Sequence, residues 1–218
     1  MTLWDWGFAL ETLPMLGQGL LVTLQVTFTA TAIFLSLGLV IALIQRSCPK
    51  WINVPLNLVT EFIRRTPLLV QLYFVFFVLP EFNIMIPPLT AGFLVMGIHY
   101  STYAAMIYGA GIDNVDRGQW DASTALNYSR LHVWIHIILP QAIPPMIPAL
   151  ANLLIGMFKE SALLTAITVM ELMGETRLIA NENYRYFEPM TIAGLIYLSI
   201  SLPAALATKA LERRLGSV

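Results

Sequence analysis

The feature that most constrains this chain is an uncharged apolar run over residues 19–44, GLLVTLQVTFTATAIFLSLGLVIALI. About 20 such residues are enough for a helix to cross the hydrocarbon core of a bilayer. The composition agrees, since 57% of the residues are hydrophobic, 11% are charged and the mean hydropathy is +0.72. Soluble domains carry about 25% charged residues. The sequence therefore predicts an all-α integral membrane protein.

The remaining apolar stretches predict one membrane domain over residues 1–218 with about five spans. After the first span, we expect further spans over residues 66–79, 89–109, from 141 onward, and 189–208. The fourth contains Pro144, Pro145 and Pro148, so it should be kinked or partly unwound. The segment 161–173, SALLTAITVMELM, is too short to cross and predicts a re-entrant or surface helix.

The basic residues divide unevenly between the two sides of these spans. With the N-terminus outside, the inner segments hold Arg46, Lys50, Arg64, Arg65, Arg117, Arg130, Lys209, Arg213 and Arg214. Only Arg177 and Arg185 fall clearly outside, and Lys159 is ambiguous. The positive-inside rule therefore predicts an outer N-terminus and a cytoplasmic C-terminus.

The predicted outer side carries two smaller features. Trp4 and Trp6 are expected to anchor an outer amphipathic segment at the membrane interface. A mildly acidic outer loop is expected to contain Glu171, Glu175, Glu182 and Glu188 together with Arg177 and Arg185.

A polar, helix-capable island interrupts the apolar sequence at residues 117–142, RGQWDASTALNYSRLHVWIHIILPQA. Asp116 is a plausible N-cap, and Asp121 lies in the first turns, where the helix dipole favours an acidic side chain. The small residues that follow would let another surface approach closely, with Trp120 and Leu126 as apolar anchors. Asn127 suits the left-handed position that ends a helix. The island predicts a cytoplasmic docking element for a soluble partner, and an ordinary loop helix is the alternative.

Four stretches together carry a family resemblance that covers most of the chain. They are GLLVTLQVT, EFIRRTPLLVQLYFVFFVLP, RGQWDASTALNYSRLHVWIHIILPQAIPPMIPAL and FKESALLTAITVMELMG. In order and spacing they resemble the permease subunits of ABC importers for polar amino acids. The resemblance implies a type I ABC importer permease in the bacterial inner membrane, with a cytoplasmic coupling loop, the EAA loop, over residues 112–140. In this family a short helix of that loop sits in a groove of the ATPase and transmits its closure. The role transfers to Gly118, Gln119, Trp120, Asp121, Ala122, Ser123, Ala125, Leu126 and Asn127.

The same resemblance defines the expected partners. The chain has no G-x-x-x-x-G-K-[ST] motif, so we expect an ATPase dimer in separate chains to bind and hydrolyse the ATP. A second permease, an extracytoplasmic solute-binding protein and membrane lipid are the other expected partners, and nothing suggests nucleic acid. We expect no enzymatic activity, cofactor or metal in this chain. His132 and His136 share a helical face but lack the glutamate of H-E-x-x-H and a third ligand nearby. An ATP-independent secondary transporter is a remote alternative, because neither inverted repeats nor coupling-ion acids are visible.

The solute is suggested by similarity to the ectoine and hydroxyectoine branch. MTLWDWGFALETLP, LPQAIPPMIPALAN and YFEPMTIAGLIYLSISLPAAL look like that branch. Relatives usually carry Y-x-A-E-x-x-R in the third span, but here Met106 replaces the glutamate and Tyr108 lies near the arginine position. A buried carboxylate in a span is usually functional, so its absence weakens the case for a cationic amino acid. Tyr103, with Tyr100 and Tyr108, could present aromatic faces to a delocalised cation, or simply pack. A permease for glutamine, glutamate or a basic amino acid remains the alternative.

The other candidates for the substrate path lie near the end of the fourth span. Lys159 and Glu160 are charged residues close to the membrane, and the family places its K-[DE]-[ST] motif along the outer part of the path. They are expected to act as a gate or substrate contact, or else to form a structural ion pair. Asn152, on the same helix, is a weaker candidate.

Overall fold

The computed structural model describes residues 4–215, and every regular element in them is helical. The α-helices are α1 (Trp6–Ser47), α2 (Lys50–Arg65), α3 (Leu68–Tyr73), α4 (Pro88–Asp113), α5 (Arg117–Ala125), α6 (Arg130–Val133), α7 (Leu139–Glu160), α8 (Leu172–Asn183) and α9 (Phe187–Leu215). Two π-helical segments, η1 (Phe74–Val78) and η3 (Trp134–Ile138), and two 3₁₀ segments, η2 (Leu79–Phe82) and η4 (Ser161–Ile167), continue these helices. The predicted all-α class is confirmed.

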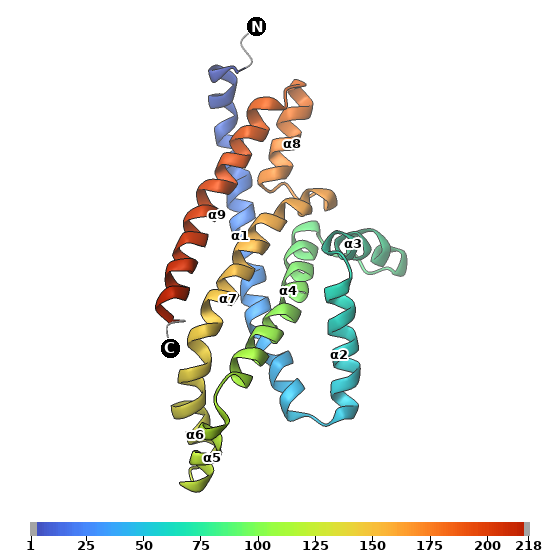
Figure 1. Cartoon of the computed structure of the whole chain (residues 1–218). Coiled ribbons are helices and arrows are strands. Elements are labelled where there is room, and N and C mark those ends of the chain that lie inside the picture. Colours follow the sequence, from blue (N-terminus) through green and yellow to red (C-terminus); the bar gives the residue numbers. More distant parts are fainter. Residues whose placement is uncertain (1–3, 216–218) are drawn as a thin grey trace.

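The first helix, α1, is the longest and runs through the middle of the molecule over most of its height, while α5 and α6 lie below its end (Figure 1). It starts at Trp6 because the Asp5 carboxylate accepts hydrogen bonds from the backbone amides of Gly7 and Phe8, at 2.9 and 3.2 Å. The helix therefore begins well before residue 19, where the span was predicted to start, and the segment that contains Trp6 continues into it without a break. Trp4 instead packs edge-to-face on Trp6 and on Phe187 of α9.

Helix α4 packs along α1, and small residues set how closely the two approach. A Cβ atom built on Gly38 would lie 2.7 Å from the Ala104 Cβ, and one on Gly97 would lie 2.6 Å from Ile33. Small residues serve this purpose in membrane helices, where close packing replaces the hydrophobic effect. The main core forms around this contact and contains Phe34, Leu72, Met96, Tyr100, Met157 and Leu164.

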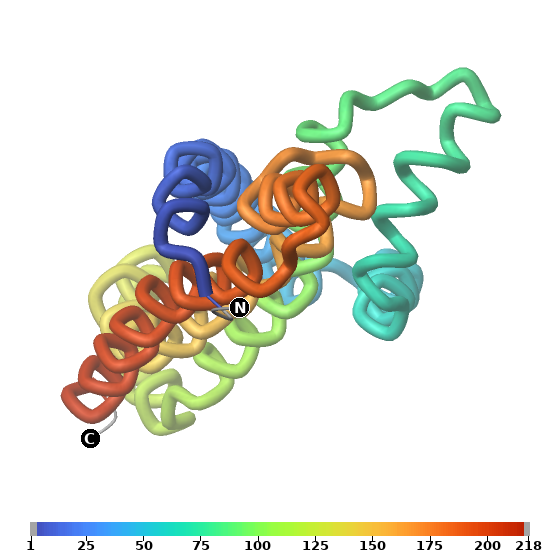
Figure 2. Tube along the Cα trace, turned by 90° about the horizontal axis from the view of Figure 1, so that it is seen from above, coloured from blue at the N-terminus to red at the C-terminus, as the bar shows by residue number. Residues whose placement is uncertain are grey.

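The predicted second span over residues 66–79 is not a straight helix. Helix α2 ends at Arg65, and Thr66 is extended (φ −94°, ψ 132°) because the following Pro67 disfavours the helical region. The α3–η1–η2 arm then leaves at 103° to α2 and projects away from the bundle (Figures 1 and 2). The two segments could form one broken span or a re-entrant loop.

The fourth span begins earlier than predicted, since a helical stretch runs from Arg130 to Ile167. Its irregularity lies at the π-helical segment η3, immediately before Pro140 near the start of α7. Proline removes a helical donor and crowds the preceding turn, which accounts for a local change of winding there. Pro144, Pro145 and Pro148 lie within α7, which remains α-helical through them.

The segment 161–173 does not form one separate helix, because residues 161–167 continue the stretch from Arg130 and Leu172 already belongs to α8. Its first part is η4, whose Ser161, Leu164 and Ile167 are buried. Glu171 then caps α8 and is fully buried, so the expectation that it belongs to an outer acidic loop was wrong. Its carboxyl oxygens accept hydrogen bonds from the amides of Met173 and Gly174 and from the hydroxyls of Thr23 and Tyr197, so this buried polar group has partners.

Three helical stretches of the described residues are long and apolar enough to cross a membrane. They are Trp6–Ser47, Arg130–Ile167 and Phe187–Leu215, and the bent pair would add a fourth. Helix α4 has 26 residues, but its polar middle, from His99 to Tyr103, keeps it outside that group. Together with α4, which spans about 39 Å at 1.5 Å per residue, the stretches match the expected number of about five.

Candidate functional site

The polar island forms α5 and the start of the next helical stretch, at the lower end of the bundle (Figure 1). Asp116 caps α5, as predicted, by accepting a hydrogen bond from the Gly118 amide at 2.6 Å. A Cβ on Gly118 would lie 2.7 Å from the same Asp116 oxygen, so glycine leaves room for the cap. The local sequence therefore determines where this short helix starts.

The end of α5 is also determined locally. Asn127 has a φ of 57°, which confirms the prediction that it takes the left-handed position. The amides of Leu126 and Tyr128 donate to the carbonyls of Ala122 and Ser123, at 3.0 and 3.2 Å. A helix of nine residues, marginal by itself, thus has both ends satisfied.

One side of α5 is held against its own chain. Ser123 is buried, and Trp120 meets Trp134 edge-to-face with ring centroids 5.4 Å apart. Trp120 is thus occupied by an internal contact and is not a free apolar anchor, whereas Leu126 is 63% exposed. The remaining residues assigned to the docking helix are exposed: Gly118, Gln119, Asp121, Ala122, Ala125 and Asn127.

A cleft of about 350 Å³ separates α5 from α6 and η3. Its walls include both indole rings, Tyr128 and Arg130. Helix α5 therefore projects from the bundle, with one side packed against the chain and the other side exposed. This arrangement suits contact with another molecule.

The candidates for the substrate path on α4 do not share one environment. The Tyr103 hydroxyl donates to the Arg64 carbonyl and the Tyr108 hydroxyl to the Leu35 carbonyl, both at 3.3 Å. Both tyrosines therefore join α4 to a neighbouring helix. Met106 is 56% exposed and points out of the chain.

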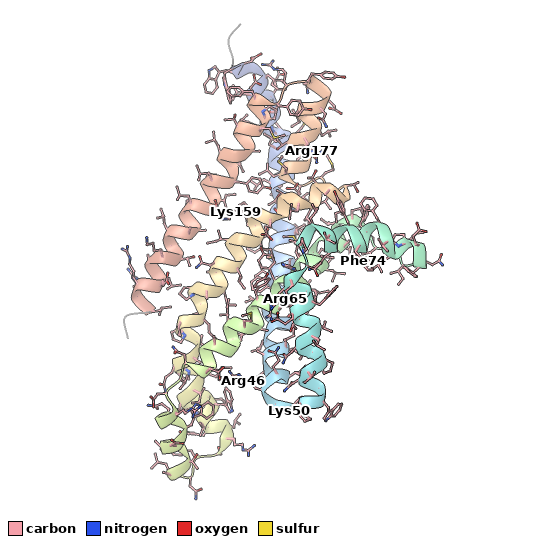
Figure 3. The ribbon with its side chains drawn as sticks, turned by 45° about the vertical axis from the view of Figure 1, so that its right-hand side comes forward. Arg46, Lys50, Arg65, Phe74, Lys159 and Arg177 are labelled. Carbon is pink, nitrogen blue, oxygen red and sulfur yellow. The ribbon has the colours of Figure 1, made fainter. Side chains whose placement is uncertain are left out.

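Glu160 and Lys159 do not form the ion pair that was one of their two expected roles. Within residues 4–215 no ion pair involves Lys159, and adjacent helical residues point in different directions. The Glu160 carboxylate instead accepts a hydrogen bond from the Tyr100 hydroxyl of α4, at 2.9 Å. Figure 3 shows Lys159 on α7 above the level of Arg65, between Arg65 and Arg177 in height.

A polar stripe on α7 faces this contact. Asn152, Gly156 and Glu160 follow one another at intervals of four residues and so lie on one face of the helix. A Cβ on Gly156 would lie 3.5 Å from the Tyr100 oxygen, so the stripe passes directly beside that hydroxyl. Asn152 and Glu160 are both exposed in the single chain.

Two further polar residues, His99 and Gln71, were not among the predicted site residues and lie close to each other between α4 and α3. His99 Nδ1 is 3.2 Å from the Gln71 amide oxygen, which links α4 to α3. The His99 ring packs against Tyr100 and Tyr103 with centroids 5.7 and 5.4 Å apart. Nothing in the local sequence pattern predicts this pairing, because Gln71 and His99 belong to different elements.

At the end of the molecule opposite α5, side chains connect the start of α1 to the start of α9. Arg185 donates to Asp5 at 3.1 Å, pairs with the buried Glu188 and lies 4.5 Å from the centroid of the Phe8 ring. The hydrogen bond from Arg185, followed by that from the Phe8 amide, lowers the pKa of Asp5 below its usual value. Glu188 therefore belongs to a closed cluster of side chains and not to an open acidic loop.

Known proteins resemble the chain over nearly its whole length. The profile of the family described as binding-protein-dependent transport system inner membrane component matches residues 34–217. The chain belongs to this family. A probable amino-acid ABC transporter permease protein of Sinorhizobium fredii is 38% identical over 93% of this chain and 90% of its own length. The arginine transport system permease protein ArtQ of Bacillus subtilis is 33% identical over 98% of both chains.

Further relatives and solved structures agree with this assignment. A putative glutamine transport system permease protein of Rickettsia prowazekii is 33% identical over 91% of both chains. The crystal structure of an amino acid ABC transporter with histidines superposes with a TM-score of 0.91, at 38% identity over 98% of this chain and all of the other. An inward-facing structure of the MetNI methionine ABC transporter, 17% identical, shares the fold with a TM-score of 0.76 over 92% and 96% of the chains. The fold is that of a type I ABC permease, and the protein is a multi-pass component of the inner membrane.

Proposed function

We propose that this chain is the permease subunit of an ATP-driven importer for amino acids or an amino-acid-like compatible solute. The relatives named for amino-acid, arginine and glutamine transport support this class. A separate ATPase dimer, a second permease and a solute-binding protein complete the importer. The single chain leaves the α3–η2 arm uncovered, with Phe74, Phe77 and Phe82 more than half exposed, which favours a second permease (Figure 3).

The observation that carries the coupling role is the geometry of α5. It is a short helix with both ends fixed, one side packed on the bundle and an exposed face of small and polar residues. We propose that this face docks on the ATPase, with Asp121 and Ala122 at the contact. Small side chains allow close approach, and the fixed ends let a push on the helix pass into the bundle.

The proposed orientation places α5 and the C-terminus in the cytoplasm. Arg46 and Lys50 lie at the lower end of the bundle and Arg177 near the upper end (Figure 3), in agreement with the positive-inside rule. Arg65 lies at mid-height in the same view, so Arg64 and Arg65 carry less weight in this argument than the sequence alone suggested. The remaining inner residues still outnumber the two outer ones.

Three solutes remain candidates for transport: ectoine, glutamine and arginine. Similarity to the ectoine branch favoured ectoine, whereas relatives named for glutamine and arginine support those amino acids equally well. Glu160 offers a carboxylate beside Tyr100, so the lack of a carboxylate at Met106 does not exclude a cationic solute. Any of the three would present a cationic centre to Glu160.

The test is uptake into proteoliposomes that contain the permeases, ATPase and binding protein, with labelled ectoine, glutamine and arginine supplied separately. ATP-dependent uptake of one of them is expected. Uptake by this chain without ATP would refute the importer and support a secondary transporter.

The coupling role has its own test. Asp121→Lys and Ala122→Trp should leave the complex assembled in the membrane but lower the solute imported per ATP hydrolysed. Matched controls are Glu182→Lys and Ala207→Trp, at exposed positions of α8 and α9. If the α5 variants imported as much solute per ATP hydrolysed as the two controls, the coupling role of α5 would be refuted.

A further inference from the structure

Helices α1 and α4 end beside each other, and one arginine serves both ends. Arg46 lies in the last turn of α1, and its terminal nitrogen donates to the Gly109 carbonyl at 2.6 Å. The same nitrogen is 2.6 Å from a carboxylate oxygen of Asp113, the last residue of α4. Gly109 and Asp113 are one helical turn apart, so Arg46 spans the final turn of α4. We call these three residues the end clamp.

The end clamp supplies what α4 lacks by itself. Helix C-termini favour a nearby cation. The last turn of α4 contains no basic residue, and Arg46 provides the missing charge from the neighbouring helix. A guanidinium suits this task because its planar donors can meet a carbonyl and a carboxylate together. The final turn of α4 is thereby tied to α1 and less free to fray.

The chain passes from α4 into α5 directly after this turn. Two residues, Asn114 and Val115, separate Asp113 from Asp116, the cap of α5. Val115 is buried in a cluster with Ile112 and Met146, and the Asn114 amide donates to the Ala110 carbonyl at 2.9 Å. A displacement of α5 therefore enters α4 at Asp113.

Beyond the clamp, α1 and α4 pack closely at Gly38, which faces the backbone of α4, and at Gly97, which faces the Ile33 side chain of α1. A frayed last turn would absorb a displacement of α5 before it reached this pair. A clamped turn passes the displacement to both helices, and α1 runs over most of the height of the molecule (Figure 1).

We propose that Arg46 is a positioning residue for coupling, which holds the last turn of α4 so that movement of α5 is transmitted to the α1–α4 pair. The proposal rests on the coupling role of α5 proposed above. Its contribution is geometric and not to overall stability. The Asp113 side chain is 72% exposed and that of Arg46 28%, and such partly exposed pairs contribute little to unfolding free energy.

The experiment uses the complete complex in lipid. The variants are Arg46→Gln, Asp113→Asn and the charge exchange Arg46→Glu with Asp113→Arg. Arg65→Gln is the matched control, because Arg65 also pairs with a carboxylate, Glu61, but on α2 and away from α5. Two quantities are measured: amide hydrogen exchange over residues 109–116, and labelled ectoine, glutamine or arginine imported per ATP hydrolysed.

Arg46→Gln is expected to speed exchange in this segment and to lower the import ratio, each by about threefold, the scale of one such ion pair. Asp113→Asn should act in the same direction but less, because the bond to Gly109 remains. The charge exchange should recover part of both quantities, and Arg65→Gln should change neither.

Unchanged exchange in Arg46→Gln would refute the clamp, whatever happens to transport. Faster exchange with an unchanged import ratio would show that Arg46 has a structural role alone, which also overturns the proposal. A wild-type complex that imports none of the three solutes would refute the proposed function, while the exchange data would still show separately whether the clamp exists.

Discussion

The contact of α1 with α4 can be tested at Gly38, where a single methyl group should separate the two helices. A Cβ at this position would lie 2.7 Å from the Ala104 Cβ, 2.9 Å from the Ser101 carbonyl oxygen and 3.2 Å from the Ala105 amide nitrogen. Two of these three atoms belong to the α4 backbone, so a change of rotamer cannot relieve the overlap. Gly38→Ala should therefore shift the helices themselves.

The net effect is the difference between two opposing contributions. Alanine gains about 0.5–1 kcal/mol over glycine inside a helix, because it loses less backbone entropy on folding. Overpacking a well-filled interface costs about 1–3 kcal/mol. Gly38→Ala should thus destabilise the protein by about 1 kcal/mol, which corresponds to a fall of about 2–4 °C in Tm for a chain of this size.

Gly17 and Gly194 provide matched controls, since both lie in helices and a Cβ on either would have no neighbour within 4 Å. Gly17→Ala and Gly194→Ala should raise Tm or leave it unchanged. The assay is thermal unfolding of the purified complex in detergent, followed by tryptophan fluorescence. If Gly38→Ala raised Tm as much as Gly17→Ala, the argument from close backbone contact would fail.

Three further predictions concern the two ends of the molecule and its middle. Asp116→Ala removes the cap of α5 and should cost that helix about 1 kcal/mol, which would lower the solute imported per ATP, whereas Asp116→Asn should retain most of the import. Tyr100→Phe keeps the ring but removes the hydrogen bond to Glu160, and should raise the apparent KM for the solute by about two- to tenfold, with Tyr73→Phe on the exposed arm as control. At the outer end, Arg185 holds the pKa of Asp5 below 3.8, so the contribution of this contact to stability is present above about that pH and is lost as the pH falls through the lowered pKa. The protection of the amides of residues 5–9, which is the intrinsic exchange rate divided by the observed rate at the same pH, should fall in that acidic range, and in Asp5→Asn this protection should no longer depend on pH.

The elements that the sequence predicted well are those fixed by neighbouring residues. Asp116 and Asn127 determine α5 because a cap and a left-handed turn act within a few residues. The apolar run of the first span was equally clear, but its start was missed because hydropathy alone does not reveal the cap at Asp5. The bend after Arg65 could have been inferred from Pro67, which breaks the helix just where the apolar run begins.

The elements that the sequence predicted poorly depend on contacts between distant helices. Glu171 caps α8 through the local amides of Met173 and Gly174, but its burial depends on Thr23 of α1 and Tyr197 of α9, which are distant in sequence. Likewise, Glu160 has no partner within its own helix, and its bond to Tyr100 depends on how α4 packs against α7. The partners of an ionisable side chain in such a protein can be predicted from the sequence only when they are also near in sequence.

The same distinction separates the two parts of the proposed function, which are coupling to the ATPase and selection of the solute. The two ends of α5 are determined locally, since the Asp116 cap and the Asn127 turn act within a few residues. A solute path is built between helices, and Asn152, Glu160 and Tyr103 are exposed or partly exposed in one chain, so a second permease would be needed to enclose them. Substitutions on α5 should therefore affect import of every solute alike, whereas substitutions along the α7 stripe should change the relative uptake of ectoine, glutamine and arginine. If Glu160→Gln lowered uptake of all three probes equally, the stripe would not contribute to solute selection.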